Sequence, residues 1–178
     1  MTTAGPRPLP AEIGFEPARP DAADARLVMA WRNDPVSLAA AYHPRPKLWP
    51  DFLEEFRSTY FTAVPGPVFA VHLGRRIGFL RLEPADHPPR SGRFVEIGIN
   101  LAPDSRGRGL GVAVLLALDG HLRAQGVDGV MAEVRAGNAA SLRAFAAAGY
   151  QDLGPAVVLV ADTGEQAAIV RFMKDLRP

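Results

Sequence analysis

Apolar and polar positions along the chain repeat with two different periods, which divides it into predicted strands and predicted helices. Alternating or unbroken apolar runs predict strands at residues 13–16, 68–73, 77–83, 94–101, 130–134, 157–160 and 168–173. Apolar residues spaced three and four apart predict helices that begin after Pro20, Trp49, Gly109 and Asn138. The predicted order is a strand, two helices, three strands, a helix, a strand, a helix and a final hairpin.

Stretches rich in proline, glycine and polar residues separate these elements. Residues 1–10 are small and proline-rich and predict a flexible tail, which leaves 11–178 as a single domain. The first helix is expected to break at Asn33-Asp34-Pro35, and the tract 39–46 is expected to be irregular. The last hairpin is expected to turn at 162–165.

A glycine-rich loop lies between the strand at 94–101 and the helix that follows it. It reads Arg106-Gly107-Arg108-Gly109-Leu110-Gly111. Because glycines carry no side chain, successive backbone N–H groups can converge on one anion, and the positive end of the helix dipole adds to this effect. The loop matches neither a Walker loop, which needs Lys followed by Ser or Thr, nor the G-x-G-x-x-G dinucleotide fingerprint. The pattern predicts a cradle for a diphosphate of another kind.

Two blocks resemble motifs of the GNAT superfamily of N-acetyltransferases. The spacing Arg106-x-x-Gly109-x-Gly111 resembles the acetyl-CoA pyrophosphate loop of that family. A second block resembles the family's N-x-x-S-x-x-x-[YF]-x-x-x-G-[FY] element and reads Asn138-Ala-Ala-Ser141-Leu-Arg-Ala-Phe145-Ala-Ala-Ala-Gly149-Tyr150. The resemblance is best over 68–153. It implies an α/β (α+β) fold, with a mixed, strongly twisted sheet of about six or seven strands and about four helices on both faces.

The same resemblance implies acetyl-CoA as cosubstrate, without a metal, and a set of cofactor-binding residues. Main-chain N–H groups of the loop would hold the pyrophosphate, at Arg106, Gly107, Arg108, Gly109, Leu110 and Gly111. The family splays its fourth and fifth strands, so the backbone of Ile99, Asn100 and Leu101 would bind the pantetheine arm and polarise the thioester carbonyl. Asn138 and Ser141 would also contact coenzyme A, although an N-cap role alone explains Asn138 and a solvated surface position alone explains Arg108.

Glu96 is the candidate general base. Alternation along the strand places Val95 and Ile97 on one face, and places Glu96, Gly98 and Asn100 on the other. A carboxylate, a glycine and an amide are unusual on a central strand unless that face borders a wet cleft. A carboxylate there can take a proton from an ammonium, which must be neutral before it attacks a thioester. The alternative is a salt bridge or a solvated edge residue.

Phe145 departs from the family pattern. Many members have a tyrosine at this position, which protonates the leaving thiolate. A phenylalanine cannot donate a proton, so a water or Ser141 does so, or the thiolate leaves unprotonated. The sequence therefore names no general acid.

The acceptor is expected to bind near the first helix. Trp31-Arg32-Asn33-Asp34-Pro35 resembles an element of acetyltransferases that act on amino-sugar nucleotides, and of ribosomal-protein N-acetyltransferase relatives. Trp31 could stack on a base or sugar and Arg32 could meet a phosphate, with Asn33, His43 and Trp49 lining the same cleft. The alternative is an amphipathic helix end followed by an Asn-Asp-Pro turn.

Composition narrows the class of function. The 178 residues carry a net charge of +1, so the overall charge does not favour binding to nucleic acid or to an acidic membrane. The chain contains no cysteine, which excludes a thiolate metal site and a cysteine nucleophile. No apolar run reaches the length of a membrane span, so a cytoplasmic enzyme is expected. The leading hypothesis is an N-acetyltransferase of a small amine, with a nucleotide-linked amino sugar as first guess. A protein or peptide N-acetyltransferase and a non-catalytic acyl-CoA-binding module stay open, and the resemblance also allows a homodimer.

Overall fold

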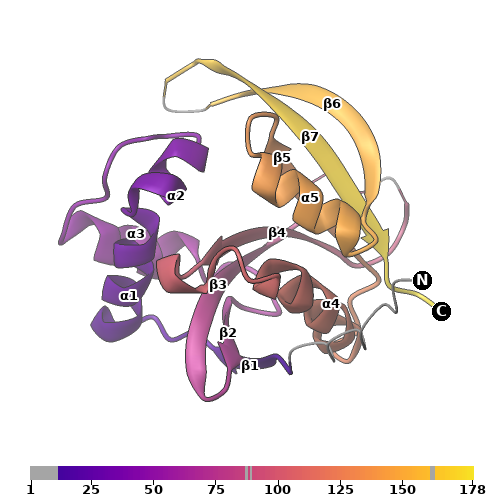
Figure 1. Cartoon of the computed structure of the whole chain (residues 1–178), viewed down its shortest axis with the longest axis horizontal. Coiled ribbons are helices and arrows are strands. Elements are labelled where there is room, and N and C mark those ends of the chain that lie inside the picture. Colours follow the sequence, from indigo (N-terminus) through magenta and orange to yellow (C-terminus); the bar gives the residue numbers. More distant parts are fainter. Residues whose placement is uncertain (1–11, 87, 89, 161–162) are drawn as a thin grey trace, which may run out of the picture.

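The computed structural model describes residues 12–86, 88, 90–160 and 163–178. The predicted tail at 1–10 and Asp162 of the predicted final turn lie outside these residues. The described chain forms a seven-stranded sheet in the order β1-β2-β3-β4-β5-β7-β6 (Figure 1). The strands are β1 (Gly14–Pro17), β2 (Val68–His72), β3 (Arg75–Pro84), β4 (Phe94–Leu101), β5 (Gly129–Arg135), β6 (Gln151–Leu159) and β7 (Gln166–Asp175).

Helices cover both faces of the sheet, as the family resemblance predicted. They are α1 (Ala22–Arg32), α2 (Pro35–Ala40), α3 (Asp51–Thr59), α4 (Leu110–Arg123) and α5 (Ala139–Ala147). One apolar cluster joins α1 and α3 to Phe69 and Phe79, and a second joins α4 and α5 to alternate residues of the central strands. Because successive strand residues point to opposite faces, these clusters define an α1/α3 face and an α4/α5 face.

Two elements differ from the sequence-based expectation. Helix α2 was not predicted, and it extends to Ala40, into the start of the tract 39–46 that was expected to be irregular. It begins because Asp34 accepts hydrogen bonds from the N–H groups of Val36 and Ser37. Pro35 suits the first turn of a helix, since its missing N–H would have no partner there. Strand β6 starts at Gln151 and not at 157. It contains Pro155 and an irregularity between Asp152 and Pro155, which an edge strand tolerates.

The central strands β4 and β5 separate part-way along their length. They pair in parallel at only three positions, Phe94–Gly129, Val95–Val130 and Glu96–Met131. Beyond Glu96, strand β4 continues to Leu101 against β3 alone, and β5 continues to Arg135 against β7. The sheet is therefore split between β4 and β5, immediately past Glu96.

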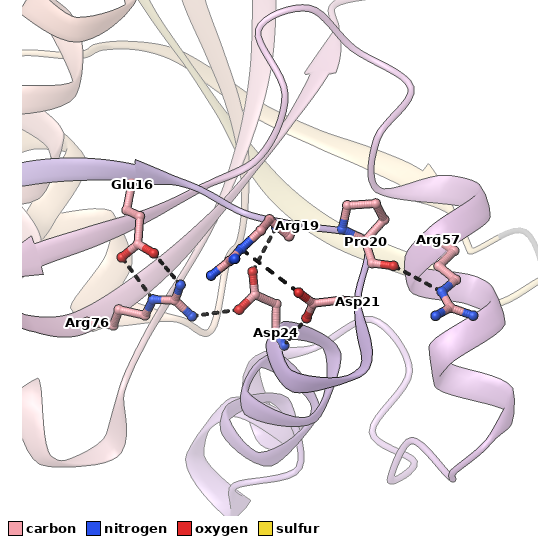
Figure 2. Close-up of polar contacts among 7 residues, drawn as sticks. All are labelled: Glu16, Arg19, Pro20, Asp21, Asp24, Arg57 and Arg76. Carbon is pink, nitrogen blue, oxygen red and sulfur yellow. Dashed lines mark hydrogen bonds and ion pairs between the residues drawn. The ribbon is translucent and has the colours of Figure 1, made fainter.

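A charged network fastens α1 to the β1–β3 edge of the sheet. Figure 2 shows Arg76 between Glu16 and Asp24, with 2.7 Å from Arg76 Nη1 to Asp24 Oδ1. Asp24 is only 2% exposed, and its other oxygen accepts from the Arg19 N–H at 2.7 Å. The Arg76 guanidinium also lies 4.1 Å from the centre of the Phe69 ring. A buried carboxylate with this many partners is held for structure, well away from the split.

Candidate functional site

A cavity of about 830 Å³ occupies the split between β4 and β5. Residues of both faces line it. Ile97, Ile99 and Phe145 come from the α4/α5 face, and Glu96 and Glu133 come from the α1/α3 face. The cavity therefore connects the two faces of the sheet through the opening that the diverging strands leave.

Glu96 is a partly buried carboxyl in this cavity, and its environment differs from that of its acidic neighbours. Glu83 pairs with Arg81 at 2.6 Å and Glu133 pairs with Arg171 at 3.0 Å. Glu96 has no ion-pair partner among the described residues. Burial raises the pKa of Glu96 to about 7, and the charges of Glu133, Glu83 and Asp86 add to this while Arg171 opposes it. A carboxyl with this pKa can take up and release a proton near neutral pH.

The glycine loop has the backbone geometry of an anion cradle. Gly107 and Gly109 have φ angles of 72° and 73°, which L-residues with side chains rarely adopt. Gly109 is the N-cap of α4 and no side chain caps the helix there, so the first N–H groups of α4 are left for another acceptor. Gly107, Gly109 and Gly111 line the cavity, whereas Arg108 and Leu110 do not. The glycine positions thus fit a diphosphate held by main-chain N–H groups.

The side chain of Arg106 connects the loop to α2. Its Nη1 pairs with Asp34, and its Nη2 donates to Ser37 Oγ at 2.8 Å and to the Leu101 carbonyl at 3.1 Å. Ser37 Oγ in turn donates to Asn100 Oδ1 at 3.0 Å. The Arg106 guanidinium is therefore already engaged with protein groups.

The other expected cofactor residues lie along the same cavity. Ile99, Asn100, Leu101, Asn138 and Ser141 all line it. Asn138 is the N-cap of α5 and its side chain accepts from the Ser141 N–H at 3.2 Å. These residues run from the open edge of β4 to the start of α5, so they border the opening from two sides.

Phe145 also lines the cavity and is otherwise buried. Its ring stacks on Phe172 with centroids 5.5 Å apart. Its side chain has no hydrogen-bonding group. The position at which many family members have a proton-donating tyrosine is therefore apolar in this chain.

The residues expected to bind the acceptor divide into two groups. Arg32 and His43 line the cavity, and Arg32 Nη1 donates to Tyr60 Oη at 2.5 Å. Trp31 is 9% exposed and packs edge-on against Phe69 in the α1/α3 core. Neighbours on a helix diverge by about 100°, which is why Arg32 faces the cavity and Trp31 faces the core. The expectation that Trp31 meets a base or sugar is therefore corrected.

Asn33 and Trp49 also have structural partners in place of the expected cleft. Asn33 exchanges two hydrogen bonds with the backbone of Lys47, at 2.9 and 2.7 Å. The Trp49 ring lies 3.9 Å from the guanidinium carbon of Arg26. Neither residue lines the cavity. Both instead fix the chain between α2 and α3.

Sequence reasoning missed Tyr42 and Glu133. Glu133 lies two residues past Met131, the partner of Glu96, so it shares the face of Glu96. An acidic residue inside the apolar run of β5 was a signal that could have found it. Tyr42 lies in the tract expected to be irregular. The residue lines the cavity, and its buried hydroxyl has no hydrogen-bond partner in the described chain. Only tertiary structure brings it to the site.

The described residues offer neither a metal-binding cluster nor a membrane-spanning helix. They contain no group of three or more His, Cys, Asp or Glu side chains that could hold a metal ion. In the same part of the chain, none of the helices is long and apolar enough to cross a membrane.

Comparison with known proteins places the fold and the motifs in one family. Residues 13–151 match the model of the acetyltransferase (GNAT) domain. Mycothiol acetyltransferase of Thermobispora bispora is 32% identical over 162 residues, covering 84% of this chain and 50% of that protein. The chain thus spans about half the length of this curated relative.

Solved structures share the fold at low sequence identity. An aminoglycoside acetyltransferase, AAC(6')-Ib, in complex with coenzyme A superposes with a TM-score of 0.74 at 17% identity, covering 92% of this chain and 95% of that one. The ribosomal-protein-alanine N-acetyltransferase of Brucella melitensis gives 0.68 at 22% identity, covering 90% and 98%. The family model matches most of the length of this chain, and the curated relative is also an acetyltransferase. The chain therefore belongs to the GNAT family of acetyltransferases.

Proposed function

We propose that this protein transfers the acetyl group of acetyl-CoA to the primary amine of a small molecule. The observation that carries the proposal is Glu96, a carboxyl with a pKa of about 7 and no ion pair within the described chain. It lies in a cavity that also reaches the glycine cradle on the other side of the split sheet. The curated relative and the structural neighbours are named as acetyltransferases, which supports the reaction class.

The donor side of the site would use main-chain groups. The N–H groups at Gly107, Gly109 and the start of α4 would hold the pyrophosphate. The open edge of β4 from Ile99 to Leu101 would hold the pantetheine arm, and an N–H there would polarise the acyl carbonyl. When bound, acetyl-CoA supplies an activated acetyl thioester.

The acceptor side would use Glu96 as general base. An amine is an ammonium ion at neutral pH and must lose a proton before it can attack a carbonyl carbon. Glu96 takes that proton, directly or through a water, and releases it to solvent after the transfer. Phe145 cannot protonate the leaving sulfur, so the thiolate departs as such or takes a proton from water.

The acceptor that we propose to test first is a nucleotide-linked amino sugar. Arg32 supports it, because a guanidinium that lines the cavity can meet a phosphate. Burial of Trp31 removes the support for base stacking. The names of the structural neighbours add two other amine classes, aminoglycosides and an alanine of a ribosomal protein.

The test is product analysis with acetyl-CoA that carries ¹³C in its acetyl group. The amines are glucosamine, UDP-linked glucosamine, kanamycin and a peptide with an N-terminal alanine. We expect the label on one of these amines, with release of coenzyme A, and a much lower yield with Glu96→Gln. Binding of intact acetyl-CoA, with no release of coenzyme A and no label on any amine, would instead indicate a non-catalytic acyl-CoA-binding module.

A further inference from the structure

Two buried side-chain polar atoms lack a hydrogen-bond partner in the described chain, and both belong to residues that line the cavity. They are Tyr42 Oη and Arg81 Nε. Buried polar groups in native proteins are almost always paired, so each exception needs an explanation. A group that stays unpaired because its partner is a ligand is one such explanation, and a position inside the cavity fits it.

Tyr42 is held at the split by its own neighbourhood. Arg135 Nη1, on β5, donates to the carbonyl of Ala41 at 2.6 Å. The Ala41 N–H donates to the Leu38 carbonyl at 3.1 Å and ends α2. The residue before Tyr42 is therefore bonded to both α2 and β5, which fixes the position of Tyr42 at the wall of the cavity.

Four charged groups act on the pKa of the Tyr42 hydroxyl. Glu133 and Glu96 act on it from β5 and β4, while Arg135 and Arg171 oppose them from β5 and β7. Arg171 is bonded to Glu133 and Arg135 is bonded to Ala41. Glu96 has no ion-pair partner in the described residues, so it is the carboxylate beside Tyr42 that is open to a ligand cation.

We propose that Tyr42 Oη and the Glu96 carboxylate together hold the acceptor nitrogen, with Tyr42 as the residue that orients it. This inference rests on the proposed function and adds a residue that selects and positions the amine. An ammonium has three N–H donors, and the tyrosine oxygen and the carboxylate are two acceptors on residues that line the same cavity. The hydroxyl can donate its own hydrogen to a neighbouring carboxylate while it accepts from the amine.

The proton balance of this arrangement is simple. One N–H proton moves to Glu96, and the nitrogen keeps its hydrogen bond to Tyr42 Oη. The lone pair then forms the C–N bond to the acetyl carbon as the C–S bond breaks, and the electron pair of the C–S bond leaves with the sulfur. A second N–H proton passes through water to the thiolate, which gives the amide and the free thiol of coenzyme A. Because one N–H stays bonded to Tyr42, the direction of the lone pair is fixed during the transfer.

A role for Tyr42 as acid toward the leaving sulfur is disfavoured. Burial raises the pKa of Tyr42 to about 12, with Glu133 and Glu96 contributing. A thiol has a pKa of roughly 8.5, so transfer of the tyrosine proton to a thiolate would be uphill by more than a thousandfold. The hydroxyl stays protonated and acts by hydrogen bonding.

The test compares Tyr42→Phe with Tyr150→Phe, using the amine of the panel that the wild type acetylates best. Each variant removes one buried hydroxyl. Tyr150 Oη is bonded to Asp119 at 3.2 Å and does not line the cavity. Loss of a hydrogen bond to a charged group typically weakens binding about ten- to a hundredfold. We expect Tyr42→Phe to raise the acceptor KM by about this factor and to leave the acetyl-CoA KM and the Tm unchanged. Tyr150→Phe should lower the Tm and leave both KM values unchanged.

Other outcomes separate the failure of this inference from the failure of the proposed function. If the wild type acetylates an amine and Tyr42→Phe keeps the same acceptor KM, the role of Tyr42 is refuted and the reaction stands. A fall in kcat alone, with the acceptor KM unchanged, would show that Tyr42 does not hold the amine in the bound state, and would also refute the proposal. A lower Tm together with equal rises in both KM values would make it structural. If the wild type acetylates no amine, both proposals fall.

Discussion

At the scale of single residues, the proposed role of Glu96 as general base predicts that activity depends on pH near neutrality. Burial and the nearby Glu133 raise its pKa to about 7. Below that pH the carboxyl is protonated and cannot take a proton from the amine, so kcat/KM should fall about tenfold per pH unit. Above it the carboxylate is formed and this dependence should level off.

The pH profile of Glu96→Gln provides the check. We expect kcat/KM to drop roughly a hundredfold or more and the inflection near the pKa of Glu96 to vanish. The acceptor amine has its own pKa, which adds a second inflection to the pH profile. Two acceptors of different basicity distinguish the two inflections, because the amine's inflection moves with the acceptor and that of Glu96 does not. An identical profile in wild type and variant would remove Glu96 from the role of base.

Substitution of Arg32 tests whether the acceptor carries a phosphate. If the acceptor carries a phosphate, Arg32→Ala should raise its KM about ten- to a hundredfold, the size of a lost charge-assisted contact. The acetyl-CoA KM should stay nearly the same, because Arg32 is on α1 and the cradle is at α4. The matched substrates are glucosamine and UDP-linked glucosamine. Equal rates with both in the wild type would end the sugar-nucleotide proposal.

At the scale of elements, helix α2 connects the acceptor side to the cofactor loop. Asp34 caps α2 and pairs with Arg106 of the glycine loop. Asp34→Ala removes both contacts, so we expect the KM values for amine and acetyl-CoA to rise together, by roughly three- to tenfold for the loss of such a cap. Asp21→Ala is the control, since Asp21 caps α1 through the Asp24 N–H at 2.9 Å. A change confined to one substrate would show that α2 does not couple the two sites.

The cradle between β4 and α4 predicts where acetyl-CoA binds. A ligand that binds only the native state stabilises it by roughly 2.7 kcal/mol at a hundredfold excess over Kd. Gly109→Glu should abolish the rise in Tm that acetyl-CoA produces, because the left-handed backbone and the open space at Gly109 would be lost. Gly120→Glu, inside α4 where a Cβ meets nothing, should keep it. A normal shift in a folded Gly109→Glu would place the cofactor elsewhere.

The sequence predicted those elements that have a regular pattern of apolar and polar residues. Strand β4 was predicted at 94–101, as observed, because its alternation is regular and ends at Pro103. Helix α2 was missed because it is only six residues long and depends on one cap. The alternation along β4 predicted that Glu96 faces a cleft, and the spacing of the glycines predicted that the loop borders a ligand site. Both line the cavity. Tyr42 and the bond of Arg106 to Asp34 join segments far apart in sequence, which no local pattern reveals.

At the scale of the whole molecule, the split sheet brings two binding surfaces to one point. The glycine loop and α4 belong to one side of the sheet, and α1 to α3 belong to the other (Figure 1). The cavity between β4 and β5 joins them, with Glu96 at the last paired position. The chain has no cysteine that could carry an acetyl group between the two sides. Donor and acceptor are therefore expected to be bound at the same time.

The central claim is that acetyl-CoA and an amine meet in this cavity and react there directly. The measurement that tests it most directly is the initial rate as a function of both substrate concentrations, with the acceptor that the panel identifies. Direct transfer in a ternary complex predicts double-reciprocal lines that intersect. Parallel lines, with the ¹³C-acetyl group found on the protein itself, would contradict the account, because they would require an acetylated side chain as an intermediate.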